Sequence, residues 1–117
     1  MFRFEKFDVW QKAIDFADRV YSGTRQFPND ERFGLTSQMR HAAVSISSNI
    51  AEGSSRSSDK EFTHFLEIAY GSLMEVVSQS QVACRQSFMT EEDVKTLYNE
   101  ADELARMLSG FRAKLKS

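Results

Sequence analysis

The chain has 117 residues, of which 41% are hydrophobic and 27% are charged, with one proline and five glycines. This composition excludes a disordered chain and predicts one ordered domain over residues 1–117, large enough to bury a core without disulfides or a structural metal. A formal net charge of −2 excludes a strong overall attraction to nucleic acid, so such binding needs a local basic patch.

Signals for secretion or membrane insertion are missing from the sequence. The opening stretch MFRFEKFDVW contains acidic residues where a signal peptide is continuously apolar, and no segment approaches the roughly 18 apolar residues of a membrane span. Cys84 is the only cysteine, and its helical spacing from Val77 and Ser80 indicates a small core residue in a reducing compartment. We therefore expect a cytoplasmic protein that does not contact a membrane.

The first predicted helix begins at Asp8, because Asp8 and Gln11 have the spacing of a capping box. Its apolar residues recur at steps of three and four: Val9, Ala13, Phe16, Ala17 and Val20. The segment Phe27-Pro28-Asn29-Asp30 ends it, because the residue before proline avoids the helical region. Three phenylalanines alternate ahead of this helix and predict an extended arm over a groove of the bundle or of a neighbouring subunit, with a frayed tail as the alternative: Phe2, Phe4 and Phe7.

The second predicted helix runs from near Thr36 to Glu52 and ends at Gly53, a residue type that can take the left-handed C′ conformation. Beside its apolar face lies a row of mostly small or amide side chains, here called the polar seam: Gln38, His41, Ser45, Ser48, Asn49 and Glu52. Buried polar groups need partners, so we expect the seam to bond to neighbouring helices or to another subunit. A catalytic or ligand-binding seam is the alternative.

A third face of this helix is poor in charge. Arg40 is its only cation, and the other residues are small or uncharged: Thr36, Ser37, Val44, Ser47 and Ala51. Such a face suits close contact with another chain.

The third predicted helix follows the polar turn GSSRSSDKE, in which Ser58 and Glu61 form a capping box. Its apolar arc continues as far as Cys84. Gly71 interrupts the helix at about 1 kcal/mol relative to alanine, so we expect a neighbouring helix to approach closely there.

The fourth predicted helix opens with Thr90 and Asp93, again at capping-box spacing, and its apolar positions alternate steps of three and four as far as Leu115. No strand pattern competes anywhere. Four amphipathic helices with short connections predict an all-α fold, an antiparallel up-down-up-down four-helix bundle.

Four stretches of this sequence resemble the 23S rRNA intervening-sequence protein family, also called the four-helix bundle protein family: WQKA, FP, FGLTSQMRHAAVSISSNIAEG and GSLME. The resemblance covers nearly the whole chain. It implies a small cytoplasmic bundle that assembles into a ring, usually a homopentamer, with no established catalysis. Similar bundles are accessory proteins of diversity-generating retroelements, which implies binding to a reverse transcriptase and nucleic acid. Here His41 stands where many relatives have Arg, and Ser47 where Pro is common, which weakens the transfer of a basic surface.

Catalytic and metal sites are poorly supported by the sequence. Glu61-x-x-His64 supplies half of the di-iron bundle pattern, which needs two such pairs and two further inward glutamates. Glu52 and Glu75 lack a nucleophile or a phosphate-binding glycine loop, and Ser72 lacks a nucleophile elbow. We expect these three residues to hydrogen-bond at helix contacts, and we predict no catalytic residue, no metal and no cofactor.

Two functions remain open from the sequence. The first is a non-catalytic homo-oligomeric scaffold, a pentamer by resemblance, that holds a partner protein or RNA. The alternative is an accessory protein that binds structured RNA or ribosomal RNA, alone or with a nucleic-acid-processing protein. In that case Arg40, Arg56 and Lys60 are expected on one rim of the ring, where repetition of the subunit would multiply their charge.

Overall fold

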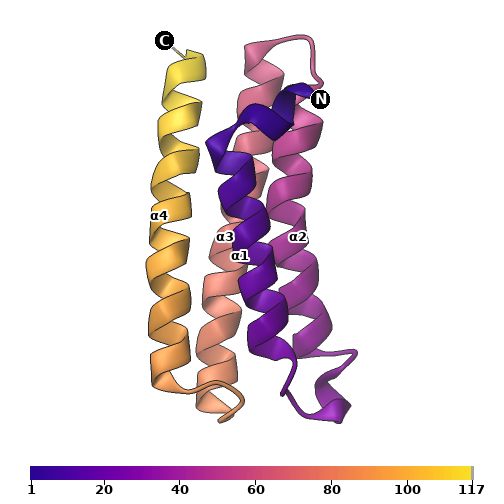
Figure 1. The fold of residues 1–117 in the computed structure, drawn as a ribbon, viewed down its shortest axis with the longest axis vertical. Coiled ribbons are helices and arrows are strands. Elements are labelled where there is room, and N and C mark those ends of the chain that lie inside the picture. The colour runs from indigo at the N-terminus through magenta and orange to yellow at the C-terminus, as the bar shows by residue number, and fades with distance from the viewer. Residues whose placement is uncertain (117) are drawn as a thin grey trace.

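The computed structural model describes residues 1–116, whose backbone forms four α-helices and two short 3₁₀ helices. In chain order these are η1 Arg3–Lys6, α1 Asp8–Thr24, η2 Asn29–Glu31, α2 Leu35–Ser54, α3 Asp59–Arg85 and α4 Glu91–Lys116. Figure 1 shows that consecutive α-helices run in opposite directions, so the predicted antiparallel four-helix bundle is confirmed. The bundle measures 43 × 23 × 22 Å.

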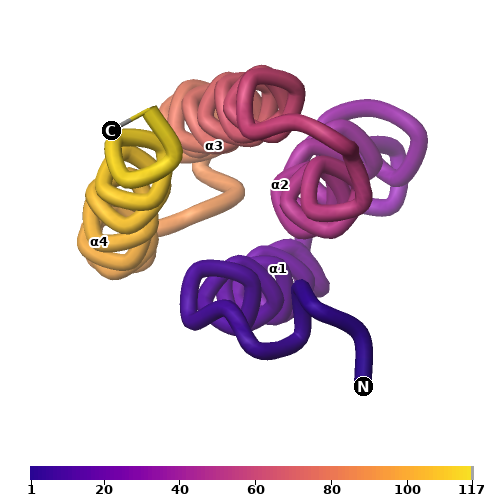
Figure 2. Tube along the Cα trace, turned by 90° about the horizontal axis from the view of Figure 1, so that it is seen from above, coloured from indigo at the N-terminus to yellow at the C-terminus, as the bar shows by residue number. Residues whose placement is uncertain are grey.

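Each helix packs against two others around a common core. Viewed from above, α1 lies between α2 and α4, and α3 closes the opposite side (Figure 2). The largest fully buried side chains come from all four helices at the predicted spacing: Phe16, Val20, Met39, Ile46, Ile50, Phe62, Leu66, Leu73, Val76, Leu104 and Leu108. Ser80 is the polar exception in this layer, and its hydroxyl donates to the Val77 carbonyl oxygen at 2.7 Å, which satisfies the buried group within its own helix.

The start of α1 differs from the prediction. Phe7, not Asp8, is the N-cap residue, and no side chain caps the helix. Phe7 is fixed by packing instead, because its ring lies 4.9 Å from that of Phe111 and 6.1 Å from that of Phe62, measured between centroids. The residues before it form η1 rather than an extended arm, although they do cover the end of the bundle, where Arg3 Nη1 donates to the Ser54 carbonyl oxygen at 3.1 Å.

Two helical glycines differ from the roles predicted for them. Gly53 is not a left-handed cap but a buried residue inside α2, and a Cβ atom there would lie 2.7 Å from Phe65 Cβ and 2.8 Å from Phe62 Cδ1. The close approach of helices therefore occurs at Gly53. Gly71, by contrast, is exposed on α3, and a Cβ atom there would meet nothing within 4 Å.

Caps at the other helix ends follow the sequence more closely. Ser58 Oγ accepts the Glu61 N–H at 3.1 Å, and Thr90 and Asp93 exchange side-chain to backbone hydrogen bonds at 3.0 and 3.4 Å. The end of α3 was not anticipated. The Ser87 N–H donates to the Cys84 carbonyl oxygen at 3.0 Å, and the Ser87 φ of 64° then turns the chain so that the Phe88 N–H reaches Ala83 O at 2.8 Å.

Candidate interaction surface

The polar seam has a bonded centre between α2 and α3. Ser45 Oγ lies 3.0 Å from Ser72 Oγ across the two helices. Asn49 Nδ2 donates to the Ser45 carbonyl oxygen at 2.8 Å and to Ser45 Oγ at 3.0 Å. All three side chains are half-buried. This three-residue network joins α2 to α3 through hydroxyl and amide groups without placing a charge in the interface.

The remaining residues predicted for the seam stand outside this network. Gln38, His41, Ser48 and Glu52 are exposed along α2, and Glu75 is exposed on α3, where it accepts from Gln79 Nε2 at 3.2 Å. Glu75 is therefore bonded within its own helix, and no hydrogen bond among residues 1–116 joins it to Glu52. The seam therefore continues from a bonded centre onto an exposed polar surface.

The outward face of α3 combines exposed apolar side chains with small and acidic residues. Ile68, Met74 and Val82 have exposed fractions of 41%, 40% and 50%. At about 100° per residue they lie on an arc of about 120° centred near Gly71, and Ser78 and the exposed carboxylates Glu67 and Glu75 lie inside the same arc. The outward face of α2 carries Val44, exposed to 40%, among the small residues noted in the sequence, on the side of α2 that borders α1. We call the α3 arc the α3 outer face.

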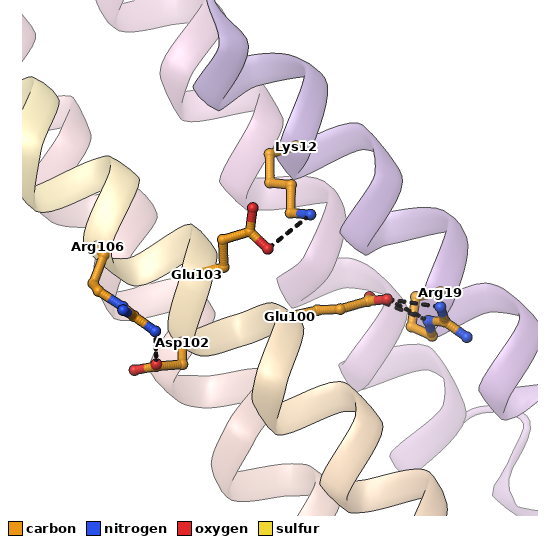
Figure 3. Close-up of polar contacts among 6 residues, drawn as sticks. All are labelled: Lys12, Arg19, Glu100, Asp102, Glu103 and Arg106. Atoms are coloured by element: carbon orange, nitrogen blue, oxygen red, sulfur yellow. Dashed lines mark hydrogen bonds and ion pairs between the residues drawn. The ribbon is translucent and has the colours of Figure 1, made fainter.

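The opposite side of the bundle is different, because ion pairs cross between α1 and α4 (Figure 3). Lys12 Nζ lies 3.1 Å from Glu103 Oε2, and Arg19 Nη2 lies 2.7 Å from Glu100 Oε1. The hydrogen bond from Arg19 to Glu100, followed by the charge of that carboxylate, raises the pKa of Arg19 above its ordinary value. We interpret this side as a solvated face. Exposed ion pairs of this kind contribute only about 0–1 kcal/mol each to the free energy of unfolding.

Arg40 does not share a rim with Arg56 and Lys60. It lies toward the start of α2, whereas Arg56 and Lys60 lie beyond its other end, which places them about 24 Å away along the helix rise. Its Nε donates to Thr24 Oγ1 at 2.9 Å, and its guanidinium carbon lies 4.7 Å from the centroid of the Tyr21 ring. Arg40 is therefore a half-buried link between α1 and α2.

Arg56 and Lys60 line a cleft of about 850 Å³ between the α2–α3 connection and the end of α4. Arg56 covers the Phe65 ring at 4.7 Å from its centroid, which leaves its charge exposed. The same cleft is lined by Lys116 and by three carboxylates: Asp59, Glu61 and Glu67. Three cations and three acids give no net formal charge, so one subunit has little attraction for phosphate at this rim.

The described residues contain neither a cluster of metal ligands nor a membrane-spanning helix. Among residues 1–116 no group of three or more His, Cys, Asp or Glu side chains is arranged to hold a metal ion, and Glu61 and His64 are both exposed. No helix within the same residues is long and apolar enough to cross a membrane.

One exposed aromatic side chain was not predicted from the sequence. Phe33 lies between α1 and α2, outside any amphipathic pattern, and it is the most exposed large aromatic side chain described. The available signal was an aromatic residue between an arginine and a glycine in a polar connection, which periodicity cannot detect.

Comparisons with known proteins agree with the geometry. The family model described as 23S rRNA-intervening sequence protein matches residues 5–110. A crystal structure of a protein with unknown function from the S23 ribosomal protein family of Bacteroides thetaiotaomicron is similar, with a TM-score of 0.78 and 23% sequence identity over 89% of this chain and 97% of that one. This likeness shows the fold alone. No curated protein matches this chain.

Proposed function

The chain belongs to the 23S rRNA-intervening sequence protein family, and we propose that it works as a non-catalytic scaffold, a ring of identical subunits that holds a partner protein. The observation that carries this proposal is the α3 outer face. A 27-residue helix keeps a glycine at its centre, although no neighbouring atom within the subunit requires one. Exposed Ile68 and Met74 lie one turn to either side of that glycine, and Val82 lies further along the same face.

Physical reasoning favours contact with a second copy at this face. Gly71 costs about 1 kcal/mol of helix stability relative to alanine, which a lone subunit would not recover. A helix of a neighbouring subunit can approach closely only where the side chain is absent, and the surrounding apolar groups would then be removed from water. Heterologous contacts of this kind close into rings when the rotation between subunits permits it.

Gly71→Gln tests the proposal, with Gly110→Gln as its matched control. Gly110 is also an exposed glycine inside a helix, and a Cβ atom there would also meet nothing within 4 Å. In an isolated subunit both substitutions should raise stability by about 0.5–1 kcal/mol, because glutamine is a better helix former than glycine. In the proposed ring only Gly71→Gln should place a long side chain inside a subunit contact.

Multi-angle light scattering at micromolar concentration reads out the difference. We expect an oligomeric mass for the wild type and Gly110→Gln, and a smaller mass for Gly71→Gln with its helical circular dichroism unchanged. A monomeric wild type would refute the ring. An oligomer that is indifferent to Gly71→Gln would place the subunit contact elsewhere.

A further inference from the structure

A groove of about 410 Å³ lies between α1, the α1–α2 connection and the first turns of α2, away from the α3 outer face. Its walls carry three apolar side chains that the subunit leaves in water. Phe33 is 86% exposed, and Tyr21 and Val44 are also exposed. Isolated exposed apolar residues are ordinary, but two aromatic rings and a valine along one concavity are typical of a surface that another molecule covers.

Two arginines are stacked on these rings. The Arg32 guanidinium carbon lies 5.0 Å from the centroid of Phe33, and that of Arg40 lies 4.7 Å from the centroid of Tyr21. Arg40 is also held by its bond to Thr24 Oγ1, so its position is fixed before anything binds. Arg40 Nη2 also donates to the Tyr21 carbonyl oxygen at 3.5 Å, so Nη1 is the nitrogen that Arg40 keeps for a ligand. The Arg32 guanidinium makes no hydrogen bond within residues 1–116, and its planar edge matches the two oxygens of a carboxylate.

The groove offers donors and no acid. Its lining contains no Asp or Glu, and neither arginine forms an ion pair within residues 1–116. Glu31 precedes Arg32 in the chain, but its Oε1 accepts the Leu35 N–H at 3.1 Å and is thereby engaged at the start of α2. The site consequently presents two positive charges on an aromatic and apolar floor.

We propose that this groove docks an acidic segment of the partner protein, a short stretch in which carboxylates flank an apolar side chain. Phe33, Tyr21 and Val44 would cover the apolar residue, and Arg32 and Arg40 would each take a carboxylate. The number of charges in the groove favours an acidic peptide over single-stranded RNA. Two cations on a chain of net charge −2 suit one or two carboxylates, whereas a nucleic acid strand brings a phosphate with every nucleotide.

The inference rests on the proposed scaffold function, because it names the chemistry of the partner. The experiment is a selection from displayed random peptides of about 12 residues, which span about 40 Å when extended. The intact protein is the target, and the double variant Phe33→Ser/Arg32→Gln removes unrelated binders. Both side chains are exposed, so their loss should leave thermal unfolding unchanged. Arg40 is not used, since its bond to Thr24 ties it to the fold.

Enriched peptides should carry two or more acidic residues beside an apolar one. Fluorescence anisotropy with one labelled peptide should show affinity falling about tenfold for Phe33→Ser and for Arg32→Gln, and falling as salt is added. Phe2→Ser and Arg85→Gln are matched controls that should change nothing, because both residues are exposed and lie outside the groove.

The proposal is overturned if no peptide is enriched, if the enriched peptides lack an acidic excess, or if their binding survives Phe33→Ser. Two other occupants would also overturn it. A lower mass for Phe33→Ser in light scattering would make the groove a subunit contact, and binding of labelled oligouridine that Arg32→Gln abolishes would make it an RNA site. A monomeric wild type refutes the ring without touching the selection, so the two failures are distinguishable.

Discussion

Gly53→Ala adds one methyl group at the closest approach of α2 and α3. The new Cβ atom would lie 2.7 Å from Phe65 Cβ and 2.8 Å from Phe62 Cδ1, whereas ordinary carbon contacts lie at about 3.5–4.0 Å. The Phe62 ring can turn to relieve its contact. Phe65 Cβ is fixed to the backbone, so that contact is relieved only when the helices separate.

The magnitude follows from two opposed effects. Overpacking a core costs about 1–3 kcal/mol, and the upper end applies because a whole helix must move. Alanine recovers about 1 kcal/mol of helix propensity. We therefore expect Gly53→Ala to lower the free energy of unfolding by about 2 kcal/mol, which is about 10 °C in Tm for a domain of this size.

Urea unfolding followed by circular dichroism at fixed protein concentration measures this change. Gly110→Ala is the control, since its methyl group meets no atom within 4 Å and should raise stability by about 1 kcal/mol. Adding Phe65→Ala should not rescue Gly53→Ala, because alanine retains the offending Cβ atom. A Gly53→Ala protein as stable as Gly110→Ala would refute the packing argument.

Three further outcomes are expected. Ser87→Gly should raise stability by about 0.5–1 kcal/mol in thermal unfolding, because glycine accepts the φ of 64° without strain, and an unchanged Tm would contradict this. Asn49→Leu should cost about 1 kcal/mol, since its two bonds to Ser45 disappear but Ser45 keeps Ser72, and no loss in urea unfolding would mean the seam is solvated. In salt titrations with structured RNA, Arg56→Ala and Lys60→Ala should barely change the weak binding, because nearby acids cancel the charge of both residues. If the slope of log affinity against log salt becomes shallower in each variant, both residues contact phosphates and the prediction is wrong.

The fold follows from short-range patterns that the sequence states directly. Steps of three and four placed the buried faces of all four helices, and Ser58 and Thr90 marked two helix starts, because caps depend on residues three positions apart. Gly53 and Gly71 show where this reasoning ends. Both are glycines in helical surroundings, and only the distance to Phe65 on another helix distinguishes a packing requirement from an open surface.

The candidate surfaces were predicted only in part, for the same reason. Ser45, Asn49 and Ser72 lie at the helix contact expected of polar residues near an apolar stripe. Arg40 and Phe33 could not be placed, because one is fixed by Thr24 on a different helix and the other lies in a connection without periodicity. The charge pattern along the sequence also does not predict that three acids line the same cleft as Arg56 and Lys60.

The packing of Phe7 against Phe111 has a consequence for the order of folding. The two rings come from opposite ends of the chain, so their contact closes a loop that contains nearly the whole protein, and such contacts form late. We expect the α2–α3 hairpin to form earlier. Interactions absent from the folding transition state act mainly on the unfolding rate, so Phe7→Leu should accelerate unfolding while leaving refolding almost unchanged. Amide hydrogens near the end of α4 should accordingly exchange with solvent before those at the middle of α3.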